Sequence, residues 1–158
     1  MDTSVLIIGL VLLVIVAVPL YFVLRGQKID QKKIKALFAQ HSQGNQYQFQ
    51  LVAANNRKVL GMDTQKKGLL FIDFNLTEPF VAFQDLKRSE SCEVAISNAP
   101  GRTNALEKVE WIFMSKNGKP AENSVVFHDS DKNYIVPVYA HEELQLARQW
   151  QQAIQQHI

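Results

Sequence analysis

The chain has 158 residues, with 17 basic and 15 acidic side chains and a formal net charge of +2. Residues 25–38 hold five of the basic side chains and one acid, and Asp2 is the other acid before residue 39, which leaves 12 basic and 13 acidic side chains. A near-neutral remainder disfavours nucleic-acid binding, which usually needs a basic patch on the folded module. The single cysteine excludes an internal disulfide and agrees with a reducing compartment.

Residues 5–24 form an uncharged, largely apolar run. At about 1.5 Å of rise per residue, a helix of this length matches a hydrocarbon core of roughly 30 Å. A cleaved signal peptide has a basic start and a small-residue end, whereas Asp2 precedes this run and bulky residues close it. The sequence therefore predicts a retained transmembrane anchor within residues 1–25.

Basic residues follow this run and none precedes it. They are Arg25, Lys28, Lys32, Lys33 and Lys35. The positive-inside rule then predicts a single-pass protein of a bacterial inner membrane, with a short N-terminus outside and the rest in the cytoplasm. The same five side chains are expected to contact anionic lipid headgroups, and topology and anchoring are favoured over recognition of a specific lipid.

Residues 26–44 are expected to be a basic juxtamembrane helix or linker. Within them, Ile34, Leu37 and Phe38 form the apolar side of a short amphipathic helix that ends near Gly44. This helix either continues the membrane helix or folds back on the domain.

From Tyr47 onward the apolar residues recur with a period of two, which indicates half-buried strands. Seven strands are predicted, at residues 47–53, 57–63, 68–74, 79–86, 92–97, 108–115 and 123–129. Asn117-Gly118 is the best hairpin signal. Cys92 alternates with polar neighbours in SCEVAIS, which favours a small buried side chain over a nucleophile.

The last residues, 141–158, return to helical spacing, with Glu142 and Glu143 in the first turn and Trp150 on the apolar side. Trp150 and Trp111 are both expected to fill one core. Residues 45–158 are therefore predicted to form one compact domain of mainly β structure.

This order of elements resembles the pleckstrin-homology superfold, including its bacterial variants. The similarity is carried by the strand order, the inward Trp150, and the segments GMDTQKKGLLFIDF and FVAFQDLKRSESCEV. It implies an α+β fold in which an antiparallel sandwich or barrel of about seven strands follows the transmembrane helix and is capped by a C-terminal helix. It implies no catalytic residue. Pleckstrin-like domains often bind phosphoinositides through basic hairpin turns, and the residues in the matching turns here are Arg57, Lys58, Lys66 and Lys67.

Motifs for catalysis are absent from the sequence. There is no glycine-rich phosphate loop, nucleophile elbow or zinc-binding helix. His41, His128, His141 and His157 lack metal-ligand spacing, and HDSD at residues 128–131 is interpreted as a solvated turn rather than a metal cluster. NAPGRTN at residues 98–104 is either a binding loop or an ordinary hairpin connection. We therefore expect a protein that is not an enzyme and has no cofactor or metal.

Two functions remain open. The favoured one is a membrane-anchored interaction module that binds a protein partner or assembles with itself. The alternative is a sensor of a small ligand or lipid headgroup that uses Arg57, Lys58, Lys66 and Lys67. A pocket with all four on one rim would favour the sensor, and scattered positions would favour the interaction module.

The first testable prediction is topological. A reporter enzyme fused after Ile158 should show cytoplasmic and not periplasmic activity, because all the flanking basic residues follow the span. Activity of a periplasmic reporter at the same position would reverse the orientation.

Overall fold

The computed structural model describes residues 30–98, 106–120, 124–132 and 140–158. Its elements are α2 (Gln31–Gln40), β1 (Gln50–Asn55), β2 (Lys58–Asp63), β3 (Gly68–Asp73), β4 (Phe80–Asp85), the 3-10 helix η1 (Leu86–Arg88), β5 (Ser89–Asn98), β6 (Leu106–Ser115), β7 (Val125–Asp129) and α3 (Ala140–Gln155). The predicted membrane span and the basic residues Arg25 and Lys28 lie outside the described residues. Among the residues that are described, no helix is both long and apolar enough to cross a membrane.

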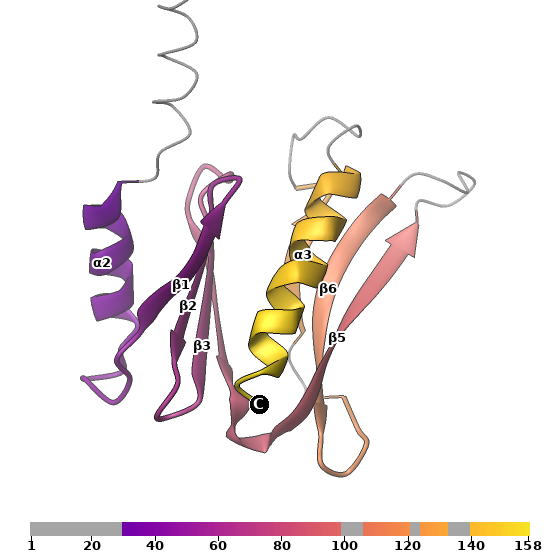
Figure 1. Cartoon of the computed structure of the whole chain (residues 1–158). Coiled ribbons are helices and arrows are strands. Elements are labelled where there is room, and N and C mark those ends of the chain that lie inside the picture. Colours follow the sequence, from indigo (N-terminus) through magenta and orange to yellow (C-terminus); the bar gives the residue numbers. More distant parts are fainter. Residues whose placement is uncertain (1–29, 99–105, 121–123, 133–139) are drawn as a thin grey trace, which may run out of the picture.

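Two antiparallel sheets make up most of the domain, which confirms the mainly β class. One sheet has four strands in the order β1-β2-β3-β4, and the other has three in the order β5-β6-β7. Figure 1 shows the two sheets on either side of α3, with α2 on the far face of the four-stranded sheet. All seven predicted strands are present, although β1 begins at Gln50 rather than at Tyr47. Gly118, with a φ of 69°, forms the expected turn after β6.

The main core lies between the two sheets and α3. Trp111 and Trp150 are 0% and 3% exposed, and their ring centroids lie 6.4 Å apart. Phe71 from the four-stranded sheet and Phe127 from the three-stranded sheet pack against both tryptophans. This confirms the prediction that one core holds both tryptophans.

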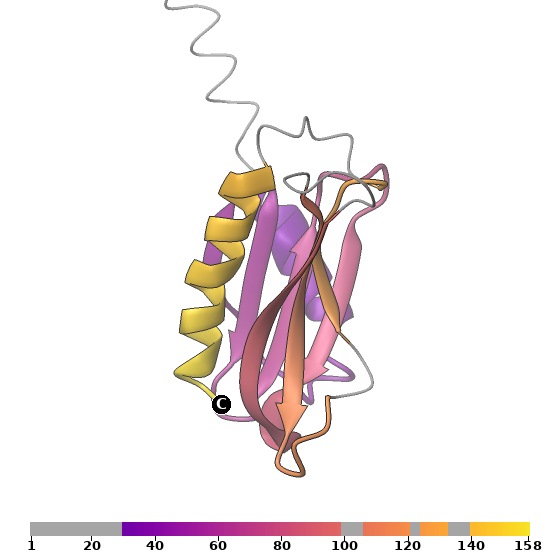
Figure 2. The same ribbon diagram turned by 90° about the vertical axis from the view of Figure 1, so that its right-hand side faces the viewer.

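Helix α3 closes one open side of this sandwich (Figure 2). It also covers the free edge of β5, because Gln155 Oε1 accepts a hydrogen bond from the Cys92 N–H at 2.9 Å and Gln151 Nε2 donates to the Cys92 carbonyl at 2.7 Å. Cys92 is 1% exposed, as predicted for a strand residue that faces the core. Burial raises the pKa of its thiol to about 12, and the Glu93 carboxylate contributes.

The central strands of the four-stranded sheet, β2 and β3, are buried on both faces, because helix α2 folds back on the outer face. Ile34 and Phe38 of α2 pack there in a second apolar cluster with Val59, Leu70, Ile72 and Phe74. A Cβ atom at Gly61 would lie 2.5 Å from the Phe38 ring, so glycine at this position allows the helix to approach the strand. Of the two options for residues 26–44, the described part of the segment takes the second and packs on the domain.

Replacing Trp150 with alanine should lower the free energy of unfolding by about 3 to 5 kcal/mol, because the indole is buried among three other aromatic rings. Urea unfolding of the full chain in mild detergent would measure this, with Trp111 fluorescence as the signal. Gln149→Ala, on the exposed side of the same helix, should cost less than about 0.5 kcal/mol. Equal effects of the two changes would mean that α3 does not stabilise the sandwich.

Candidate functional site

One lysine is completely buried where the first turn of α3 meets the four-stranded sheet. Lys58 is 0% exposed, and its Nζ lies 2.7 Å from Glu143 Oε2 and 3.6 Å from Asp73 Oδ2. Its ammonium group also lies 5.2 Å from the centroid of the Phe127 ring. Glu143 and Asp73 are buried as well, so two buried carboxylates share one buried cation.

The ends of three elements bring these charges together. Lys58 is the first residue of β2 and pairs across the sheet with Asp73, the last residue of β3. The tight turn before Lys58 has positive φ angles at Asn56 and Arg57, which suits a two-residue hairpin. Asn56 Nδ2 donates to Glu143 Oε1 at 3.2 Å, so the turn and α3 are joined twice.

An irregularity in β7 adds a histidine to the same region. Val109 pairs with His128 whereas Glu110 pairs with Val126, so Phe127 is an extra residue on β7. Such a bulge breaks the usual alternation of faces. Phe127 and His128 are consecutive, and both are buried. The expectation that residues 128–131 form a solvated turn is therefore wrong for His128, which is 2% exposed, and correct for Ser130 and Asp131.

The charges around His128 favour the neutral imidazole. Burial lowers the pKa of His128 below its ordinary value, and the Lys58 ammonium lowers it further, while the carboxylates of Glu143, Asp129 and Asp73 act in the opposite direction. Within the described part of the chain, Nδ1 of His128 has no hydrogen-bond partner.

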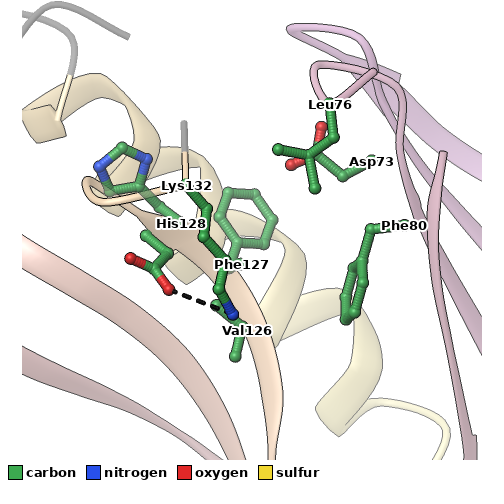
Figure 3. A pocket seen from close by; sticks show the side chains of 8 residues that line it. Asp73, Leu76, Phe80, Val126, Phe127, His128 and Lys132 are labelled. Atoms are coloured by element: carbon green, nitrogen blue, oxygen red, sulfur yellow. Dashed lines mark ion pairs between the residues drawn. The ribbon is translucent and has the colours of Figure 1, made fainter. Parts of the chain in front are cut away.

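A half-open cavity of about 50 Å³ lies beside this cluster. It is lined by Asp73, Leu76, Phe80, Val126, Phe127, His128, Asp129 and Lys132. Figure 3 shows that Asp73, Leu76 and Phe80 face the β7 residues from the opposite sheet. Pockets for drug-sized ligands usually exceed about 300 Å³. This cavity is smaller and suits a small chemical group or a few water molecules.

Over residues 30–98, 106–120, 124–132 and 140–158, no three histidine, cysteine, aspartate or glutamate side chains are arranged to hold a metal ion.

The four basic residues predicted from the sequence do not share one rim. Arg57 and Lys58 lie at the β1-β2 turn, and Lys66 and Lys67 lie at the β2-β3 turn, at the other end of β2. Six residues of strand separate the two turns by roughly 20 Å. Lys58 is not a surface cation at all, because Glu143 and Asp73 hold it inside. This scattered arrangement is the one expected of an interaction module.

The second basic turn has a structural organisation of its own. Asp63 accepts hydrogen bonds from the backbone N–H groups of Gln48, Gln65 and Lys66 at 2.7, 3.0 and 2.9 Å. Burial alone would raise the pKa of Asp63, but these three hydrogen bonds and the Lys66 charge lower it. Lys67 Nζ donates to the Ile158 carbonyl at 2.7 Å. Asp63 and the basic turn after it, which carry part of the pleckstrin-like resemblance, thus stabilise the hairpin between β2 and β3.

Of the five basic residues expected to contact lipid headgroups, the structure describes three. Lys32, Lys33 and Lys35 are exposed on α2.

Asp73, His128 and Glu143 were not predicted as site residues. In the sequence, Glu143 is only an acid in the first turn of a predicted helix. One signal was present in the sequence, because Lys58 and Asp73 each adjoin a long apolar strand segment. Charged residues beside such segments are rarely buried unless they are paired.

Comparison of the chain with protein-family models, characterised proteins and solved structures finds no match.

His128 makes the stability of the domain dependent on pH. Its pKa in the unfolded chain is about 6.5 and is lower in the fold, so between these values the unfolded state binds more protons. The contribution of the neutral His128 to the free energy of unfolding is complete above about pH 6.5. It is lost as the pH falls through the folded pKa, and the free energy of unfolding then changes by at most about 1.4 kcal/mol per pH unit.

Urea unfolding of the full chain and of His128→Gln between pH 5 and 8 would measure this term. The difference between the two proteins should shrink as the pH falls. For His141→Gln, at an exposed position, the curve of unfolding free energy against pH should run parallel to that of the unchanged chain. Parallel curves for His128→Gln would contradict the prediction.

Proposed function

We propose that this chain is a membrane-anchored, non-enzymatic interaction module of the pleckstrin-like type. Residues 1–25 hold it at the cytoplasmic face of a bacterial inner membrane, where it binds a protein partner or another copy of itself. The four-plus-three arrangement of antiparallel strands with a C-terminal helix supports the pleckstrin-like part of this proposal. The basic residues after the apolar run support the orientation.

The observation that carries the proposal is the outer edge of β1. This strand ends the four-stranded sheet, and its sequence, QLVAAN, has neither a charge nor a proline. Leu51 and Val52 are 43% and 41% exposed. Natural edge strands are usually protected by lysine, proline or a covering segment. The edge of β5 has such a cover in α3, whereas β1 offers backbone groups and apolar side chains together.

The exposed edge favours a binding mode in which an extended segment of the partner pairs with β1 as an additional strand. The register shifts between Leu51 and Ala53, so that Val52 is an extra residue. A bulge of this kind shortens the stretch over which a second strand can pair. The bound segment is therefore short, and the Leu51 and Val52 side chains anchor it.

The position of α2 supports recruitment close to the bilayer. At most about 3.5 Å per residue, the six residues between Leu24 and Gln31 span roughly 20 Å. Since α2 packs on the sheet through Ile34 and Phe38, the module stays close to its anchor and is not carried on a long tether.

The absence of an enzymatic role is supported by the chemistry of the described residues. The Cys92 thiol, with a pKa of about 12, is a poor nucleophile at neutral pH. Lys58 is 0% exposed and its Nζ is occupied by Glu143 and Asp73, so a substrate in solution cannot reach it.

Site-specific photo-crosslinking in cells would test the proposal. A photoreactive amino acid at Val52 should give a discrete crosslinked species, and mass spectrometry would assign it to a partner or to a second copy. The same amino acid at Gln152, exposed on α3, is the control. Equal or no crosslinking at the two positions would refute binding at this edge.

A charged side chain on the edge of β1 should abolish the crosslinked species. Val52→Lys protects an edge strand in the way that natural sheets do, and we expect at least about a tenfold loss of crosslinking from a neighbouring photoreactive residue at Leu51. Gln145→Lys, at an exposed position of α3, adds the same charge elsewhere and should leave crosslinking unchanged.

A further inference from the structure

The near-neutral total charge of the domain conceals a separation of charge between its two ends. The connections that follow β2, β4 and β6 lie together at one end of the sandwich, which is the lower end in Figure 1 and Figure 2. Six exposed basic side chains belong to these connections, and we call this surface the basic end. They are Lys66, Lys67, Lys87, Arg88, Lys116 and Lys119.

Backbone contacts hold the three connections of the basic end together. The Leu86 N–H donates to the Lys67 carbonyl at 2.8 Å, which joins the β2-β3 turn to η1. Helix η1 runs directly into β5, whose first residue pairs with Ser115, the last residue of β6. The Ser115 N–H in turn donates to the Lys119 carbonyl at 2.9 Å. Basic residues that are far apart in the sequence therefore form one surface across the ends of both sheets.

The acidic residues of the basic end do not neutralise it. Asp63 accepts three hydrogen bonds from backbone N–H groups, and Asp85 accepts one at 3.0 Å. Glu90 is the third acid at this end. Within the described part of the chain, none of the six basic side chains forms an ion pair with an aspartate or glutamate, whereas Lys108 and Lys132 elsewhere on the surface do.

The rest of the domain has the opposite balance of charge. The basic end has six basic and three acidic side chains, and the other described residues have eight basic and ten acidic. Exposed charges act over only about 8 Å at physiological salt, so a short acidic segment bound here interacts mainly with the basic end. An extended polyanion, such as a nucleic acid or an anionic bilayer, also meets the acidic remainder. The charge distribution thus favours a short acidic segment.

The direction of α2 gives a second reason to disfavour the bilayer, and this step rests on the anchor in the proposed function. The loop after α2 reaches the basic end, where Lys66 Nζ donates to the Gln46 carbonyl. The start of α2 lies at the opposite end of the domain (Figure 1), because its ten residues extend over about 15 Å. An anchor before α2 leaves the basic end facing away from the membrane.

We propose that the basic end binds a short protein segment rich in aspartate and glutamate. Arg88 can hold a carboxylate with two parallel hydrogen bonds, and the lysines around it supply further charge-assisted contacts. This surface is distinct from the β1 edge, which is uncharged and suits an apolar extended segment.

The probe is a fluorescein-labelled peptide of alternating glutamate and glycine, added to the full chain in phosphatidylcholine nanodiscs. We expect saturable binding by fluorescence anisotropy, and a loss of affinity of about tenfold or more when salt rises from about 0.05 to about 0.5 M, because exposed charges are screened. The same peptide with glutamine in place of glutamate should not bind. Absence of saturable binding by the glutamate peptide would overturn the proposal.

Matched variants separate the basic end from a general charge effect. Arg88→Gln combined with Lys119→Gln should weaken peptide binding by about fivefold or more. Arg148→Gln combined with Lys132→Gln removes the same two charge types at exposed positions elsewhere, and should change the affinity by less than about twofold. Equal weakening by the two pairs would contradict the proposal.

Carbodiimide crosslinking of the bound peptide, followed by mass spectrometry, identifies the lysines that it contacts. We expect crosslinks at Lys87 and Lys116 of the basic end, and none at the exposed lysines of α2. Crosslinks confined to α2 would place the peptide elsewhere and overturn the proposal.

Competition separates an acidic protein segment from other anions. Compared per negative charge, unlabelled peptide should displace the labelled peptide better than oligothymidylate or phosphatidylglycerol vesicles, and the reverse order would overturn the proposal. Val52→Lys, which blocks the β1 edge, should not weaken peptide binding. Failure of binding at the β1 edge is therefore distinguishable from failure at the basic end, and loss of peptide binding in Val52→Lys would refute a separate site.

Discussion

The arrangement of this domain depends on the buried ammonium of Lys58. A buried charge is tolerated only where its partners are well placed. Removing one partner of a buried ion pair lowers the stability of the fold by about 3 to 5 kcal/mol. Lys58 therefore fixes where Glu143, and with it the first turn of α3, can lie against β2 and β3. Trp150 follows Glu143 by two helical turns on the same face, so the ion pair also sets the depth at which the indole enters the core between the sheets.

The second constraint is that β2 and β3, the central strands of the four-stranded sheet, are buried on both faces. Its inner face carries Leu60 and Phe71 into the main core, and its outer face carries Val59 and Leu70 against α2. Helix α2 can contact β2 only because residue 61 is glycine. The Phe38 ring occupies the space that a Cβ atom at this position would take. The packing of α2 therefore completes the core on the outer face of this sheet.

These two constraints leave different surfaces for binding. At the edge of β5, the glutamines of α3 occupy the backbone groups of Cys92, whereas the edge of β1 retains exposed apolar side chains. The cavity beside Asp73 is lined by residues of β3, β4 and β7 and by none of β1. An uncharged strand edge suits an extended protein segment.

The sequence by itself determined the seven strands, the two described helices, and the burial of Cys92, Trp111 and Trp150, because apolar periodicity and turn residues are local signals. Only the tertiary structure decided that Lys58, Glu143 and His128 lie inside. Lys58 and Glu143 are 85 residues apart, and no local pattern tells whether a charge will meet its partner. A bulge in β7 turned His128 inward, and a one-residue shift of this kind leaves no mark on composition or period.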